Sequence, residues 1–144
     1  MEILISERTT TVNGDDTMPE PNYRPLTNWE RVVLAKLLSV DVPGIEVLKE
    51  QVVQARAITL DEYGSIGINV GARNSARFRD GPLVSATQSD RDTTEGYGPF
   101  INIILFVKSG LLNELQIYKD DSGEIINHID PEKFDLVVDT RLLV

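Results

Sequence analysis

The densest concentration of apolar side chains lies between residues 99 and 126. Residues 100–107 form an almost continuous apolar run, and residues 111–119 mix apolar with polar side chains. Ser109-Gly110 separates the two runs, and apolar runs on either side of a short glycine turn are typical of a β-hairpin. We expect the first strand to be central and covered on both faces, because nearly every residue in it is apolar. The second strand is mixed, which predicts a place nearer the edge of the sheet.

A period of two also predicts which side chains share a face. In the second strand of this hairpin, Leu115 and Ile117 point one way, and Glu114, Gln116 and Tyr118 point the other way. Similar short β-type runs, separated by turn-forming residues, occur on both sides of the hairpin. We therefore predict further strands at residues 57–60, 65–70, 83–87, 124–126 and 136–138, with turns at 61–64 and 120–123 and a helical turn at 131–134.

A period of three to four residues marks two helices ahead of these strands. Thr27 and Glu30 stand at the spacing of a capping box, and the apolar residues after them recur at helical intervals, which predicts a helix over residues 28–39. Pro43 begins a second amphipathic segment that runs to about Gln54. Helices first and strands later predict an α+β fold, with an N-terminal helical hairpin packed on one face of an antiparallel β-sheet.

The first 22 residues differ from the rest in composition. From residue 7 to residue 22, Thr, Asp, Asn, Gly and Pro predominate, and few side chains are available for a core. We expect a flexible N-terminal arm over residues 1–22, followed by a single α+β domain over residues 23–144. Residues 3–5 are apolar and β-forming, which predicts a short strand. Such a strand would pair with the domain's own sheet or with a partner chain, and in the second case the protein would be a homo-oligomer.

The charge of the chain narrows the choice of partners. Its 144 residues include 23 Asp and Glu against 14 Lys and Arg, a formal net charge of −9. A chain of this charge repels nucleic acid and anionic membranes, so we expect neither as a partner and favour a basic protein. An acidic surface also promotes solubility by itself, and this plainer interpretation stays open.

The composition also narrows the chemistry. The chain has no cysteine, which excludes disulfides, thiolate metal sites and cysteine nucleophiles, and it has a single histidine. The serines and glycines match no hydrolase or nucleotide-binding motif, so we predict no catalytic residue, no metal and no cofactor. We find no basic leader and no apolar run long enough to span a bilayer, and therefore expect a cytoplasmic protein.

Two groups of charged residues are candidates for binding. Acids in segments that we predict to be exposed loops are the candidate contacts for a basic protein: Asp61, Glu62, Asp90, Asp92, Glu95, Asp120 and Asp121. The alternative is a ligand site between the helices and the sheet, built from the main basic residues and the lone histidine: Arg73, Arg77, Arg79 and His128. For the arginines, a solvated loop is the simpler interpretation, because exposed ion pairs contribute little.

Two segments together resemble a known family. One is the start of the first helix, residues 24–27 with Glu30, and the other is the strand at residues 110–118 followed by Asp121 and Gly123. They are similar to a family of small bacterial domains, some of which are encoded beside polymorphic toxins and are suspected to be immunity proteins. The resemblance implies no catalytic residues.

Residues 24–126 are the part of the chain that the resemblance covers. It implies that Glu114 and Tyr118 form either a binding face or cross-strand pairs. Together with the charge, it motivates a first hypothesis: a non-enzymatic protein that neutralises a cognate bacterial toxin by binding it. The second hypothesis, from a different class, is a small-molecule-binding or enzymatic domain with its site between the helices and the sheet.

Overall fold

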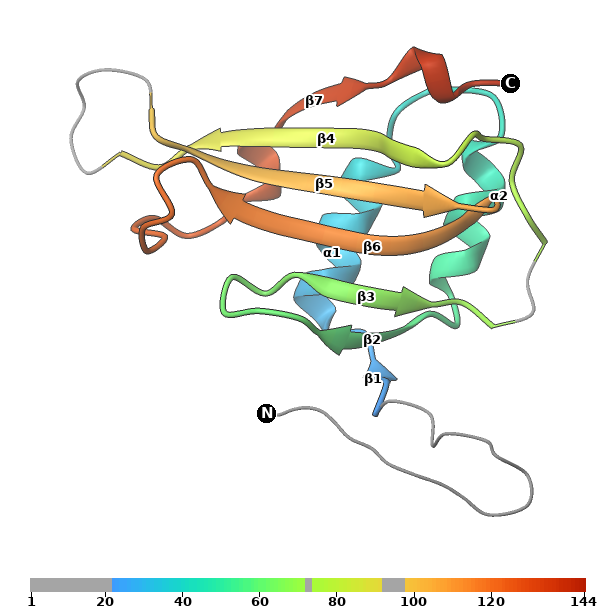
Figure 1. The fold of residues 1–144 in the computed structure, drawn as a ribbon, viewed down its shortest axis with the longest axis horizontal. Coiled ribbons are helices and arrows are strands. Elements are labelled where there is room, and N and C mark those ends of the chain that lie inside the picture. Colours follow the sequence, from blue (N-terminus) through green and yellow to red (C-terminus); the bar gives the residue numbers. More distant parts are fainter. Residues whose placement is uncertain (1–21, 72–73, 92–97) are drawn as a thin grey trace.

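The computed structural model describes residues 22–71, 74–91 and 98–144. Its centre is a seven-stranded sheet of order β1-β2-β3-β6-β5-β4-β7 (Figure 1), in which each neighbouring pair of strands is antiparallel. The strands are β1 Arg24–Pro25, β2 Arg56–Thr59, β3 Ile66–Asn69, β4 Gly81–Ser89, β5 Phe100–Lys108, β6 Leu111–Lys119 and β7 Asp135–Val138. Short 3-10 helices at Pro131–Lys133 (η1) and Thr140–Leu142 (η2) flank β7.

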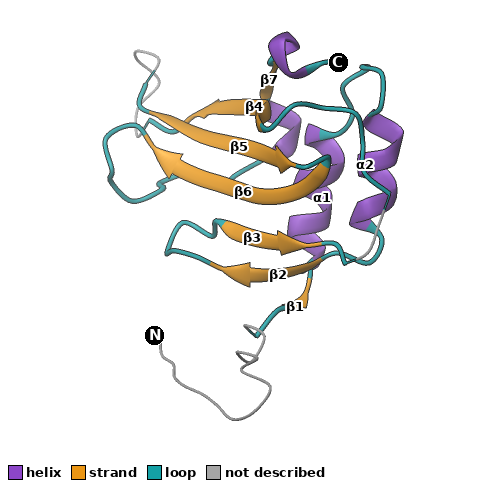
Figure 2. Cartoon of the chain, turned by 45° about the vertical axis from the view of Figure 1, so that its right-hand side comes forward, coloured by secondary structure: helices purple, strands orange, loops and turns teal. Residues whose placement is uncertain are grey.

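Two helices, α1 (Asn28–Leu37) and α2 (Ile45–Val52), lie on the same side of this sheet (Figure 2). The first contacts β4, and the second contacts α1 and β6. Their apolar faces and the inward faces of the strands share one core, which includes the fully buried Leu34, Leu48, Ile103 and Leu115. Two helices and an antiparallel sheet confirm the predicted α+β class.

The start of α1 is capped as the sequence predicts. The Thr27 hydroxyl accepts a hydrogen bond from Glu30 N at 3.1 Å, and the Glu30 carboxylate accepts one from Thr27 N at 2.9 Å. Arg24 donates to both oxygens of Glu30, at 2.9 and 2.8 Å. Burial raises the pKa of Glu30, but the hydrogen bonds from Arg24 and Thr27 outweigh it, so the pKa lies below its ordinary value. The capping box thus fixes the helix start and ties β1 to it.

The predicted hairpin is present as β5 and β6. Its turn has Ser109 and Gly110 at φ values of 54° and 75°, the left-handed conformation that a two-residue hairpin turn requires. A Cβ atom on Gly110 would clash with the backbone of Ala76, so only glycine fits there. The buried Gln51 of α2 donates to the Gly110 carbonyl at 3.0 Å and accepts from Leu112 N at 2.9 Å. One buried side chain therefore fixes α2 to the hairpin.

Three predictions about strand positions are wrong. β6 is the middle strand of the sheet and does not lie near an edge. β5 is not covered on both faces, because its residues alternate between buried and half-buried, and in Figure 1 no described element covers the face away from the helices. Residues 124–126, predicted as a strand, are irregular. The mixed sequence of β6 reflects a sheet with one open face, where alternation is expected of a central strand too.

Parts of three predictions fall outside the described residues. The described residues begin at Asn22. The predicted N-terminal arm, apart from Asn22, and its predicted strand at residues 3–5 therefore lie outside them. The same holds for Arg73, Asp92 and Glu95. Within the described ranges, no helix is both long enough and apolar enough to cross a membrane.

Candidate functional site

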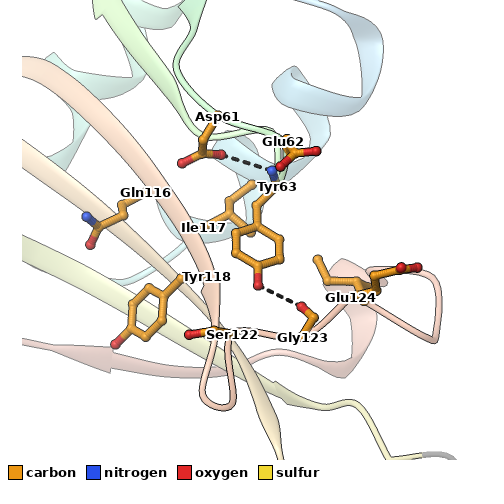
Figure 3. A pocket seen from close by; sticks show the side chains of 10 residues that line it. Asp61, Glu62, Tyr63, Gln116, Ile117, Tyr118, Ser122, Gly123 and Glu124 are labelled. Atoms are coloured by element: carbon orange, nitrogen blue, oxygen red, sulfur yellow. Dashed lines mark hydrogen bonds between the residues drawn. The ribbon is translucent and has the colours of Figure 1, made fainter.

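A hollow of about 940 Å³ lies at one end of the sheet, between the β2–β3 turn and the segment that follows β6 (Figure 3). In Figure 3 the Tyr63 side chain projects from the turn toward Gly123, and the Tyr118 ring stands apart from it on β6. The lining combines acidic, aromatic and apolar side chains: Asp61, Glu62, Tyr63, Gln116, Ile117, Tyr118, Ser122, Gly123, Glu124 and Ile125.

The hollow exists because β3 parts early from β6. The pairing of these two strands ends at Ile66 and Leu115. Beyond this point Ser65 replaces the backbone ladder, because its hydroxyl accepts from Ile117 N at 2.8 Å and donates to Ile117 O at 3.1 Å. A side chain in place of a direct backbone pair holds the β2–β3 turn away from β6, and the space between them is the hollow.

The first wall of the hollow is the β2–β3 turn. The Asp61 Oδ1 atom accepts hydrogen bonds from Tyr63 N at 3.0 Å and Ser65 N at 3.1 Å, and Gly64 completes the turn at a φ of 96°. On the far side of the ring, the Tyr63 hydroxyl donates to the Gly123 carbonyl at 2.6 Å. The ring of Tyr63 is therefore held at both ends and forms a fixed wall.

The opposite wall is the end of β6 and the turn after it. Gln116 and Tyr118 stand on the face of β6 that points away from the helices, and Tyr118 is 39% exposed. In the turn, Ser122 has a φ of 61° and its N–H donates to the Lys119 carbonyl at 2.9 Å. The turn returns the chain past the hollow, where Glu124 joins the lining.

The charge of the hollow has one sign. Asp61, Glu62 and Glu124 supply carboxylates, and no Lys or Arg is among the described residues that line it. Carboxylates attract a cation, and the faces of tyrosine rings favour an ammonium or guanidinium group further. The lining therefore suits the cationic side chains of a partner.

Reactive groups are scarce in the same lining. Its side chains include carboxylates, an amide and the hydroxyls of Ser122, Tyr63 and Tyr118, without a histidine to act as a base beside them. In the described ranges, no group of three or more metal-ligating side chains gathers to hold a metal ion.

One predicted contact residue, Asp90, is not exposed, and its assignment to a binding surface is wrong. Its exposed fraction is 0%, and it directly follows β4 on the inward side. Lys119 lies 2.9 Å away and is itself 3% exposed. The Asp90 carboxylate also accepts from Ile126 N at 2.7 Å and from Asn127 N at 2.6 Å. Asp90 therefore joins the ends of β4 and β6 to the chain beyond them.

The titration of this pair reflects its surroundings. Burial raises the pKa of Asp90, but the hydrogen bond from Ile126 N, the Lys119 ammonium and Asn127 N together outweigh it, so the pKa lies below its ordinary value of 3.8. The hydrogen bond to Asp90 raises the pKa of Lys119 above its ordinary value of 10.5, against the effect of burial. Both groups are therefore charged at neutral pH, and each neutralises the other inside the protein.

The other predicted acids divide into two sets. Asp61 and Glu62 are exposed and line the hollow. Asp120 and Asp121 are exposed in the adjacent turn, where Asp120 accepts from the Asn102 side chain at 2.6 Å and Asp121 from Gly123 N at 2.8 Å. These two carboxylates shape the turn beside the hollow and do not line it.

The predicted basic ligand site is not assembled in the described residues. Arg77 and Arg79 are exposed just before β4, and Arg79 donates to the Arg141 carbonyl at 3.1 Å. His128 is exposed near the other end of β4, where its carbonyl accepts from Gln88 at 2.9 Å. β4 has nine residues, so those ends lie about 27 Å apart. Buried apolar side chains fill the space between the helices and the sheet.

Besides Asp61 and Glu62, only Tyr118 of the lining is connected with binding by the sequence, through the family resemblance. Tyr63 belongs to a predicted turn, and Gln116 and Tyr118 to one predicted face of β6, but nothing in the sequence places the turn beside that strand. Ser122 and Glu124 are also in the lining. The alternation in β6 and the turn composition are the available signals, and only the pairing of β3 with β6 joins them.

A family model matches residues 23–129, which is most of the chain. The matched range includes both walls of the hollow. No curated protein and no solved structure matches the chain. The similarity to toxin-associated domains therefore stays a prediction. With most of its length matched, the chain belongs to the family described as a domain of unknown function (DUF6984).

Proposed function

We propose that this protein is a non-enzymatic binding protein that takes a basic partner protein at the acidic hollow. The observation that carries the proposal is the lining, in which three carboxylates and two tyrosines occur without a basic residue. An acidic surface also raises the rate of association with a basic partner, because long-range attraction steers the encounter. The net charge of −9 extends that attraction beyond the hollow.

An immunity protein, which neutralises a toxin by binding it, is the form of this function that we favour. Its partner would be a basic bacterial toxin domain that meets it in the cytoplasm. We infer that α1 and α2 act as a helical hairpin that covers one face of the sheet and leaves the hollow and the opposite face to the partner. The buried tie from Gln51 to the β5–β6 turn supports this division of labour.

A small-molecule site between the helices and the sheet has less support. The interface is occupied by side chains such as Leu37, Leu48 and Leu105, each with no exposed surface. Of the residues that would hold an anionic ligand, Arg77 and Arg79 lie toward one end of β4 and His128 toward the other.

The test is charge-dependent capture of a partner in the native cell. In one variant, Asp61→Asn, Glu62→Gln and Glu124→Gln neutralise the hollow, and the amide oxygen that the first substitution introduces can still accept the hydrogen bonds of the turn. The control, Asp41→Asn, Glu50→Gln and Glu132→Gln, removes three exposed charges elsewhere. We expect the wild type and the control to capture the same basic protein. The amount of that protein captured by the hollow variant should be lower by at least about tenfold. Expression with the captured protein should restore growth if that protein is a toxin.

Equal capture by the hollow variant and the control would overturn the binding site. Capture of no basic protein by the wild type would overturn the function itself. A captured basic protein that does not inhibit growth would retain the binding function and remove the immunity form of it.

A further inference from the structure

The face of the sheet opposite the helices is open, and one strand on it is apolar. In Figure 1 this face points toward the viewer, with the helices behind it. The outward residues of β5 are Phe100, Asn102, Ile104 and Phe106, which are half-buried, and Lys108, which is exposed at the end of the strand. An antiparallel sheet with one solvated face usually carries polar residues outward, so three apolar residues among five depart from the expected pattern.

Polar residues flank most of the apolar ridge formed by Phe100, Ile104 and Phe106, with Pro82 of β4 opposite Phe106 as the exception. On β4 the neighbours of Asn102 and Ile104 are Thr87 and Ser85. On β6 the neighbours of Ile104 and Phe106 are Gln116 and Glu114. An apolar centre with a polar rim is the anatomy of a protein–protein interface.

The ridge is continuous with the acidic hollow. Gln116 and Tyr118 line the hollow and also stand on the open face, beside Ile104 and Asn102 of β5. A partner seated on β5 would therefore reach the carboxylates of the hollow without leaving the surface.

The size of the open face is in the range of an interface. β4, β5 and β6 have nine residues each, so they present a flat area of about 30 by 14 Å, or roughly 400 Å². The short strands and the hollow extend it toward the roughly 800 Å² that each partner contributes to a standard interface.

Charge selects the occupant. A second copy on a two-fold axis would set the same acidic patch against itself, with −9 on each chain, and like charges across an interface are unfavourable. We propose that the open face along β5 is the contact surface for the basic partner, whose apolar side chains pack on Phe100, Ile104 and Phe106 while its cationic side chains enter the hollow. This inference rests on the function proposed above.

Site-specific photo-crosslinking in the native cell tests the inference directly. A p-benzoylphenylalanine replaces Phe106 in one variant and Val53 in the other, which is 68% exposed on the helical side. We expect position 106 to crosslink a basic protein and position 53 to crosslink none, and we expect the hollow-neutralising substitutions to abolish the crosslink. A crosslink from position 106 to this chain itself would identify a second copy or an internal cover, and would overturn the proposal.

Affinity for the captured partner provides the second measurement. Phe106→Ala and Ile104→Ala should each weaken binding by about 10- to 100-fold, as residues central to an interface do. Val32→Ala, on the exposed side of α1, is the control and should leave it unchanged. Capture that depends on the hollow but not on Phe106 or Ile104, with no crosslink at position 106, would overturn this inference and leave the proposed function standing. Capture that is unchanged by the hollow substitutions would overturn the proposed binding site in the hollow, and the absence of any captured basic protein would overturn the proposed function.

Discussion

Asp61 and Asp90 are both acidic residues near the end of a strand, yet they belong to regions with opposite roles. Asp90 has no exposed surface and pairs with Lys119 at 2.9 Å. Asp61 is exposed and lines a hollow whose described residues include no cation. A buried carboxylate needs a partner charge and hydrogen-bond donors, whereas an exposed one keeps its charge for a ligand.

The two regions adjoin, because β6 serves both. Lys119 points inward to Asp90, while its neighbour Tyr118 points outward to the hollow. Alternation along one strand therefore places a stabilising pair on one face and the lining of the hollow on the other. The face of the strand on which a charged residue lies, more than its residue type, decides whether its charge is paired inside the protein or exposed at the surface.

The largest expected effect is on the buried pair. Asp90→Ala should lower the free energy of unfolding by about 3–5 kcal/mol, because it leaves the Lys119 ammonium buried without its partner. Urea titration followed by circular dichroism measures the change. The control Glu62→Ala, on the exposed turn, should stay within about 0.5 kcal/mol. Similar losses in both variants would remove the distinction between the regions.

Acid should weaken the buried pair. Because the pKa of Asp90 is lowered in the folded state, its ionised form stabilises the protein above pH 3.8, and this contribution is lost as the pH falls below 3.8. Glu30 acts in the same direction, so Asp90→Asn is the reference. The stability difference between wild type and this variant should be constant from about pH 5 to pH 8 and shrink below pH 3.8. A constant difference throughout would contradict the assignment.

High pH should remove the contribution of Lys119, the other member of the buried pair, to stability. The raised pKa of Lys119 means that its contribution is present below pH 10.5 and is lost as the pH rises above 10.5. The unfolding midpoint of the wild type should therefore approach that of Lys119→Met at high pH. Parallel curves for the two proteins would argue against the ion pair.

A smaller effect is expected at the wall of the hollow. Tyr63→Phe removes the hydroxyl that donates to the Gly123 carbonyl and should cost about 1 kcal/mol of unfolding free energy, the usual value of one hydrogen bond. Tyr118→Phe is the matched control and should change stability by less than about 0.5 kcal/mol. A larger loss of unfolding free energy in Tyr118→Phe than in Tyr63→Phe would contradict this assignment of the stabilising hydrogen bond to Tyr63.

The smallest effect on stability should come from the exposed glutamates that line the hollow. Glu62→Gln together with Glu124→Gln should change the free energy of unfolding by no more than about 0.5 kcal/mol, because both residues are exposed. Thermal and urea unfolding of the double variant check this. A marked loss of stability would mean that these carboxylates are structural, like Asp90.

Much of the fold is predictable because it depends on local signals. The capping box at Thr27 and Glu30 and the turn at Ser109-Gly110 are each written within a few residues. The position of β6 is not predictable in the same way. Its mixed composition has the same appearance in an edge strand as in a central strand with one open face, and only the strand order distinguishes them.

The candidate site is predictable only in part, because its pieces are distant in sequence. Asp61 and Glu62 are among the predicted contacts, but Ser65 must bind Ile117 before their turn becomes a wall beside β6. The prediction for Asp90 fails because polar residues surround it in the sequence, while Lys119, which it pairs with, comes 29 positions later. The apolar run of β5 predicts burial on both faces, and the structure attributes it to an apolar outer face.

The most direct test is the affinity of the captured partner for the wild type, the hollow-neutralised variant and the control with three other charges removed, at low and high salt. We predict that neutralising Asp61, Glu62 and Glu124 weakens binding about 10- to 100-fold, flattens the salt dependence and leaves the free energy of unfolding unchanged. Equal affinities for the hollow variant and the control would contradict the account, because the hollow would then be one acidic surface among others.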